Sequence, residues 1–203
     1  MFRKDYYHAL NRIEISASSL LHNYQYLTEK TGQKIFPVLK SNAYGHECVK
    51  AAQILDQVKA PFFCVDSIYE AYQLLKARIT TPILIMGYIH PDNLSLKKLP
   101  FAYAVYDSEM LKAISKYQPH AGIHLFVDTG MHREGVPLNN LALFVRNCKN
   151  LNLKIEGLMS HLAMADKPKD KDTKIQVENF KKVQEILAQE KIFPKWLHLG
   201  ASS

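Results

Sequence analysis

The feature that most constrains the fold of this chain is a regular alternation of short apolar runs with segments of helical periodicity. Seven runs rich in β-branched, aromatic and aliphatic residues are typical of buried strands, and they lie at 35–39, 61–65, 82–86, 101–105, 122–127, 154–159 and 196–199. The segments around them carry apolar residues at helical spacing, which predicts helices at 18–30, 48–55, 67–78, 92–99, 108 onward, 138–149 and 175–190. A further short strand is expected at 12–15, and the charged segment 167–174 is expected to be a solvated loop. Alternation of this kind favours a parallel sheet that is covered by helices.

Seven strand–helix units in one chain are typical of a (β/α)8 barrel of the TIM type. A doubly wound open sheet is the alternative, but the chain has no glycine-rich dinucleotide-binding motif to support it. The 203 residues are enough for one α/β domain with a sizeable core. Because a closed barrel needs eight strands, we expect residues 1–203 to form an incomplete barrel.

Lys40 ends the first of these apolar runs, in the sequence IFPVLKSNAYGH (35–46). At the carboxyl end of a parallel strand, a side chain faces the crevice where ligands bind. An amine at the edge of an apolar pocket loses hydration, so its pKa falls and it can form a Schiff base or act as a base. Taken alone, a solvated lysine at a strand end is the commoner explanation, because most lysines lie on the surface.

Polar residues follow three later strands as well, at 128–133, at Ser160 and His161, and at 200–203. A glycine–serine turn offers backbone N–H groups and hydroxyls to a phosphate, and arginine suits a carboxylate or a phenolate oxygen. In a barrel these strand ends converge, and they then describe a pocket for an anionic phosphorylated aldehyde and an amino acid. Each piece also has an ordinary explanation as a turn, a strand-end histidine or a loop.

The composition narrows the classes of partner. The formal net charge is +7, but the basic residues are scattered without an aromatic–basic stripe, which argues against nucleic acid. Three dispersed cysteines without metal-ligand spacing indicate reduced thiols in a cytoplasmic protein and no metal site. The start of the chain has no apolar signal-peptide core, and no apolar run is long enough to cross a membrane.

Four segments, in this order, resemble the alanine racemases, which are fold-type III enzymes that depend on pyridoxal 5′-phosphate. They are VLKSNAYGH (38–46), DTGMHREG (128–135), GLMSH (157–161) and HLGASS (198–203). The resemblance covers nearly the whole chain and implies an amino-terminal (β/α)8 barrel followed by a separate β domain. It also implies interconversion of L-alanine and D-alanine, a homodimer, and a supply of D-alanine for peptidoglycan in the cell wall.

The resemblance assigns roles to five residues. Lys40 matches the lysine that forms the internal aldimine with the cofactor and is the base on one face of the substrate. Arg133 matches the arginine near the phenolic oxygen of the cofactor and the substrate carboxylate. His161 matches the histidine beside the pyridine ring. Tyr44 and Ser202 match residues that hold the cofactor phosphate.

The chain departs from the family pattern at two positions and in length. The residue before the phosphate serine is Ala201, where the family commonly has Asn, and Phe126 stands where many members have a lysine that braces the arginine. The family's second base is a tyrosine in the carboxy-terminal β domain, contributed by the partner subunit. That domain is absent here, so we expect residues 1–203 to be the amino-terminal portion of a racemase and to racemise poorly alone.

Two other functions remain open at this point. One is a non-catalytic protein that binds pyridoxal phosphate on the same barrel; the short length favours it, but SNAYGH and DTGMHR do not resemble that group. The other is a racemase for a different amino acid, such as serine or lysine, for which Ala201 and Phe126 leave room.

Overall fold

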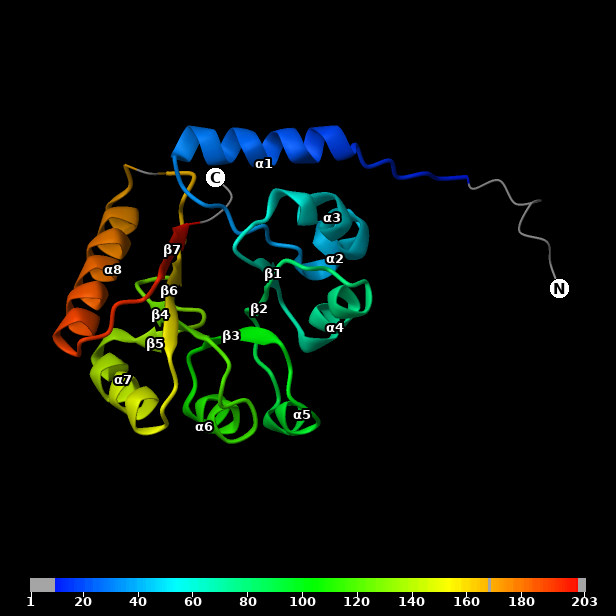
Figure 1. Ribbon diagram of the computed structural model, residues 1–203. Coiled ribbons are helices and arrows are strands. Elements are labelled where there is room, and N and C mark those ends of the chain that lie inside the picture. Colours follow the sequence, from blue (N-terminus) through cyan, green and yellow to red (C-terminus); the bar gives the residue numbers. More distant parts are fainter. Residues whose placement is uncertain (1–9, 168, 201–203) are drawn as a thin grey trace.

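The computed structural model describes residues 10–167 and 169–200, and within them a parallel sheet alternates with helices (Figure 1). The helices are α1 (Ala17–Thr31), α2 (Lys40–Tyr44), α3 (Cys48–Leu55), α4 (Ile68–Lys76), α5 (Pro91–Ser95), α6 (Ser108–Tyr117), α7 (Leu141–Asn150) and α8 (Lys171–Gln189), with short 3-10 helices η2 (Asp56–Val58) and η3 (Leu138–Asn140). The strands are β1 (Phe63–Val65), β2 (Ile83–Ile85), β3 (Phe101–Val105), β4 (Ile123–Asp128), β5 (Val136–Pro137), β6 (Ile155–His161) and β7 (Trp196–Gly200).

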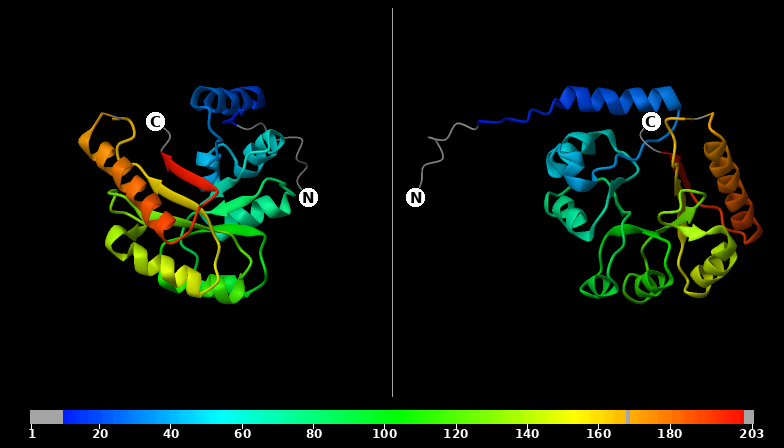
Figure 2. Two further views of the ribbon diagram at one scale, coloured as in Figure 1. Left: turned by 60° about the vertical axis from the view of Figure 1, so that its left-hand side comes forward. Right: turned by 180° about the vertical axis from the view of Figure 1, so that it is seen from behind.

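The strands of the sheet follow one another in chain order, β1-β2-β3-β4-β6-β7, and every neighbouring pair is parallel. The short β5 pairs with the end of β4 and lies off this path. The helices stand outside the curved sheet in both views of Figure 2. Chain-order parallel pairing with an outer layer of helices confirms the predicted α/β fold, an incomplete (β/α)8 barrel.

Side chains on the two faces of the sheet have different surroundings. Alternate residues of β3, such as Phe101, Tyr103 and Val105, belong to the large apolar cluster that the helices share. Ala102 and Ala104, which point the other way, belong to two small clusters on the opposite, concave face. Strands that are buried on both faces explain why their sequences are continuous apolar runs.

The first predicted barrel strand, 35–39, is reduced to a single bridge between Val38 and Cys64. Its backbone still pairs in parallel with β1, because Leu39 N donates to Cys64 O at 2.7 Å and Cys64 N donates to Pro37 O at 2.9 Å. This segment therefore occupies the first strand position, and six full strands follow it. Helix α1 runs across the side of the ring between α3 and α8 (Figure 1).

Two predictions about secondary structure were wrong. Residues 12–15 form no strand, and Ile13 is 80% exposed, because this segment lies away from any sheet edge that could pair with it. The charged segment 167–174 is only partly a loop, since α8 already begins at Lys171. Asp170 caps α8 by accepting a hydrogen bond from the N–H of Asp172 at 2.8 Å. This cap favours a helix start at Lys171 even though the first turn is highly charged. No helix among residues 10–167 and 169–200 has the length and apolar character needed to cross a membrane.

Candidate functional site

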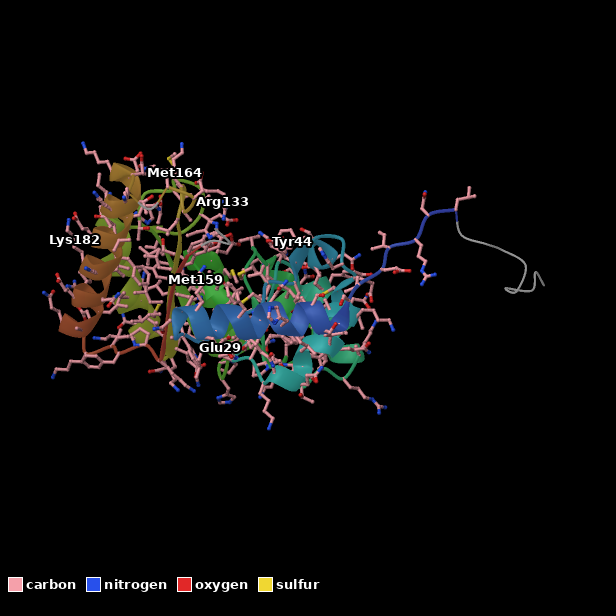
Figure 3. The ribbon with its side chains drawn as sticks, turned by 90° about the horizontal axis from the view of Figure 1, so that it is seen from above. Glu29, Tyr44, Arg133, Met159, Met164 and Lys182 are labelled. Carbon is pink, nitrogen blue, oxygen red and sulfur yellow. The ribbon has the colours of Figure 1, made fainter. Side chains whose placement is uncertain are left out.

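The predicted site residues lie at the carboxyl end of the sheet, where the chain leaves the strands. Lys40 follows the first strand position, Arg133 follows β4, and His161 is the last residue of β6. Gly200, the last described residue of the phosphate-binding segment predicted from sequence, pairs with His161 across the β6–β7 ladder. In Figure 3 the labelled Tyr44 and Arg133 lie towards the same edge of the molecule.

The turn that carries Lys40 has an unusual backbone. Four consecutive residues after it, from Ser41 to Tyr44, have φ between 52° and 56°, which is the left-handed helical region. Residues other than glycine avoid this region because Cβ crowds the backbone, at a cost of about 1–2 kcal/mol for each residue. The left-handed turn places Lys40 at its start and Tyr44 at its end. Strain of this kind clusters at functional sites and persists only where the surroundings enforce it.

Three contacts enforce the left-handed turn. The N–H of Asn42 donates to the Glu70 carboxylate of α4 at 3.3 Å, and the Asn42 side-chain oxygen accepts from the N–H of Cys48 at 2.8 Å. Ala43 is buried in the main apolar cluster. Glu70 also accepts from the N–H of Asp66 at 2.9 Å, so it ties the turn to the end of β1.

The loop that carries Arg133 is organised by Asp128 at the end of β4. One Asp128 oxygen accepts the N–H groups of Gly130, Met131 and His132, at 2.9, 2.9 and 3.1 Å. Burial by itself raises the pKa of Asp128, but these hydrogen bonds and the nearby His132 ring outweigh burial and lower it. The carboxylate therefore stays ionised and holds the loop as a compact turn.

Gly135 closes this turn with a φ of 119°, and a Cβ there would lie 2.4 Å from the nitrogen of Asp128. The loop needs glycine at this position because it passes too close to the β4 backbone for any side chain.

The pKa of His161 depends on the other charged residues of the site. Its pKa is lowered first by burial, then by the positive charges of Arg133 and Lys40, with a smaller opposing effect from Glu134. All three residues lie at the carboxyl end of the sheet, and the charges of Arg133 and Lys40 act there to disfavour a further positive charge on the imidazole. The structure thus places Lys40, Arg133 and His161 at the same end of the sheet, and burial with the two positive charges favours the neutral form of His161.

The other positions named from the sequence, Tyr44, Ser202 and Phe126, differ in burial and in whether the structure describes them. Tyr44 is 61% exposed at the mouth of the barrel. Ser202 lies outside the described residues. Phe126 is buried on the concave face and packs edge-on against Tyr106, with ring centroids 5.8 Å apart. The guanidinium of Arg133 has an ion pair with Glu134 instead, at 3.6 Å.

These groups suit pyridoxal phosphate by their chemistry. A partly buried amine can condense with its aldehyde, and an adjacent guanidinium matches its phenolic oxygen or a substrate carboxylate. Neutral His161 can lie against the pyridine ring without adding a third positive charge. Within the described residues, no cluster of three or more histidine, cysteine, aspartate or glutamate side chains could hold a metal ion.

Sequence reasoning missed the residues that support the site. Glu70, Asp128 and the α8 residue Gln176 position site loops through hydrogen bonds to backbone groups. Asp128 is among the strand-end residues at 128–133, and Asp followed by Thr and Gly indicates a turn, but its part in holding the loop of Arg133 was not predicted. Glu70 and Gln176 have no such local pattern.

Comparison with known proteins agrees with this arrangement. A family described as "Alanine racemase, N-terminal domain" matches residues 15–203. An alanine racemase of Lactobacillus gasseri is 35% identical over 177 residues, which cover 83% of this chain and 46% of that protein. An amino-acid racemase of Enterococcus faecalis is 34% identical over 195 residues, which cover 93% of this chain and 28% of that protein.

Solved structures show the same fold. Alanine racemase from Bacillus anthracis with bound L-Ala-P superposes with a TM-score of 0.82 at 27% identity and covers 92% of this chain and 50% of that one. The Clostridium difficile alanine racemase in complex with cycloserine gives a TM-score of 0.80 at 27% identity, over 90% and 52% of the two chains.

The chain spans about half the length of most of these relatives and about a quarter of the Enterococcus protein. The family match nevertheless extends over nearly all of its residues, and the fold agrees with that of the solved racemases. This chain belongs to the alanine racemase N-terminal domain family.

Proposed function

We propose that residues 1–203 are the cofactor-binding domain of a pyridoxal-phosphate-dependent racemase, an isomerase that interconverts L-alanine and D-alanine. The observation that carries this proposal is the position of Lys40, Arg133 and His161 at one barrel mouth, where burial first and then the two cations lower the pKa of the histidine. An amine, a guanidinium and a neutral imidazole are the groups that this cofactor and an amino-acid substrate require.

Each residue then has one task. Lys40 would hold the aldehyde group of the cofactor and would be the base that moves the proton at the substrate Cα on one face. Arg133 holds the substrate carboxylate and the phenolic oxygen, and His161 supports the pyridine ring. Tyr44 and Ser202 hold the phosphate. Bound pyridoxal phosphate supplies the chemistry by withdrawing electrons from Cα, which makes its proton acidic.

Racemisation needs a second base on the opposite face of Cα, because the proton must be returned from the other side. We propose that a partner subunit in a homodimer supplies this base, so residues 1–203 alone bind the cofactor but racemise slowly. The setting proposed for the reaction is the cytoplasm, where the product D-alanine would serve peptidoglycan synthesis.

The test is the absorbance spectrum of the purified chain with added pyridoxal phosphate, before and after borohydride, beside Lys40→Ala. A band that borohydride fixes, and that is lost in the variant, supports the role of Lys40, and mass spectrometry of the fixed adduct should place it on that residue. A matched control is Lys34→Ala, which removes an exposed lysine that precedes the first strand position. A band that survives in Lys40→Ala would overturn the proposal.

A second candidate is a racemase for another amino acid, such as serine or lysine. It is favoured by the Enterococcus faecalis relative, which is named an amino-acid racemase and matches 93% of this chain. Comparison of kcat/KM for alanine, serine and lysine with one preparation separates the two. A value for serine or lysine above that for alanine would replace the first proposal.

A further inference from the structure

A network of buried polar side chains joins α8 to the ends of β4 and β6, beside the candidate site. Its members are almost inaccessible to solvent: Gln176 and Thr129 are each 1% exposed, and Ser160 is 6% exposed. Burying polar side chains costs free energy unless they are hydrogen-bonded, and apolar residues would fill the same space at lower cost. The network therefore needs an explanation other than packing.

Gln176 lies at the centre of this network and both ends of its amide are used. Its Nε2 donates to the carbonyl oxygen of His161 at 3.0 Å, and its Oε1 accepts the N–H of Ala163 at 2.9 Å. The ladder of β6 ends here, since the last bond from Leu162 N to Gly200 O is long at 3.5 Å. Gln176 therefore fixes the backbone at His161 and at Ala163, on either side of the residue where the β6–β7 pairing ends.

The network also reaches the strand that leads to Arg133. Thr129 Oγ1 is 2.8 Å from Ser160 Oγ and 3.4 Å from Gln176 Nε2, and the Thr129 carbonyl accepts from Asn179 of α8 at 2.9 Å. The next residue, Gly130, packs so tightly that a Cβ would lie 3.3 Å from the Gln176 side chain. One helix thus holds the ends of two strands in a fixed relation.

From this geometry we infer that Gln176 is a positioning residue: it fixes the backbone of His161 relative to the loop that carries Arg133. The inference rests on the proposed function for its consequence, since a displaced imidazole and guanidinium would no longer fit one cofactor. Gln176 is 1% exposed and its amide is occupied by hydrogen bonds within the protein, so it acts on the site through the backbone that it holds.

The test compares two substitutions on the same buried face of α8. Gln176→Met removes the amide at nearly constant volume. Thr173→Val is the matched control: Thr173 is 6% exposed, and its hydroxyl donates to the carbonyls of Met164 and Lys167 but to no backbone group of His161. Both substitutions remove hydrogen bonds between a buried side chain and partly buried backbone groups, so both should lower the urea midpoint of unfolding.

Only the glutamine variant should alter the site. We expect the dissociation constant for pyridoxal phosphate to rise about tenfold in Gln176→Met, the loss typical of a residue that supports a binding group from behind. We also expect His161, followed by NMR in the chain without cofactor, to titrate at a higher pH, because a displaced ring would lose burial and would lie farther from Arg133 and Lys40. The negative charge of Glu134 raises the pKa of His161, but Glu134 is present in every variant, so it does not account for a difference between them. Thr173→Val should change neither quantity.

The outcomes separate the inference from the proposed function. Equal changes in both variants, or none in Gln176→Met, would show that Gln176 only stabilises the fold, and would overturn the inference. If the unsubstituted chain forms no Lys40-dependent adduct, the proposed function fails while the His161 titration still decides the positioning role. Should Gln176→Met not fold, Gln176→Asn keeps the amide uncharged but shortens its reach to His161, and it should shift the titration in the same direction.

Discussion

Lowering the pH from 7 to 5 should destabilise this chain by about 4 kcal/mol through one pair of histidines on the concave face of the sheet. Nδ1 of His124 on β4 lies 2.8 Å from Nε2 of His198 on β7, with aromatic rings of Phe36 and Phe62 packed around them. Nε2 of His124 is buried and has no hydrogen-bond partner among the described residues. An orphaned N–H is costlier than an orphaned lone pair, so His124 carries its proton on Nδ1 and donates it to His198.

The magnitude follows from the difference between the folded and unfolded states. Burial, and for His124 also the neighbouring His198, lowers the pKa of His124 to about 3, and burial lowers that of His198 to about 4, from an ordinary value of 6.5. Below pH 6.5 the unfolded chain takes up two protons that the folded chain does not. Each pH unit then costs about 1.4 kcal/mol for each ring, or about 2 kcal/mol for each ring at pH 5.

The assay is urea unfolding followed by circular dichroism and by the fluorescence of Trp196, the only tryptophan in the chain. The control is the double variant His124→Leu/His198→Leu, which keeps every other titrating group. The free energy of unfolding should fall by about 4 kcal/mol more in the unsubstituted chain than in the variant between pH 7 and pH 5. The part of the unfolding free energy that depends on the two neutral rings should be fully present above pH 6.5, and it should be lost as the pH falls below that value.

Parallel pH profiles for the two proteins would refute this reasoning, since they would mean that the rings titrate alike in the folded and unfolded states. If the double variant does not fold, NMR titration of the unsubstituted chain decides the question directly. Titration of both rings near pH 6.5 in the folded chain would then be the refuting result.

Three further predictions concern single residues. Gly157→Ala should destabilise the fold by about 1–3 kcal/mol in urea, because the new Cβ would lie 2.3 Å from Nδ1 of His124. Asp56→Ala should cost about 2–3 kcal/mol at pH 7, since its carboxylate accepts hydrogen bonds from both threonines at 80–81. Burial raises the pKa of Asp56 but those bonds outweigh it and lower the pKa, so the difference in urea stability should shrink as the pH falls through the acidic range. Asp128→Ala should weaken pyridoxal phosphate binding about tenfold in a spectroscopic titration, because the loop loses its anchor.

The sheet could be predicted from the sequence because its strands are buried on both faces. Such strands are uninterrupted apolar runs, and β3 coincides with the run at 101–105. Helix α1 was equally clear, since apolar residues on one face end at Gly32, which has the left-handed φ of 62° expected of a helix terminus. The strand predicted at 12–15 was wrong because an apolar pattern does not reveal whether a partner strand exists.

The candidate site could be predicted only in part. The motifs place Lys40, Arg133 and His161 at strand ends, and barrel geometry brings strand ends together. The support behind them depends on contacts between distant segments: Asn42 and Glu70 are 28 positions apart in the sequence, and His124 and His198 are 74 positions apart. No periodicity in the sequence marks such pairs, because they arise from how helices and strands pack.

The left-handed turn after Lys40 shows why its residues are not glycines. Glycine adopts this backbone without strain, so Ser41, Asn42, Ala43 and Tyr44 carry a cost that a glycine-rich turn would avoid. Three of their side chains have a reason to be present: Asn42 accepts from Cys48, Ala43 fills the apolar cluster, and Tyr44 stands exposed at the barrel mouth. Ser41 is exposed and its side chain has no hydrogen bond to any described residue. The strain is therefore retained where side chains are needed to hold or to complete the mouth of the barrel, with Lys40 fixed at the start of the turn.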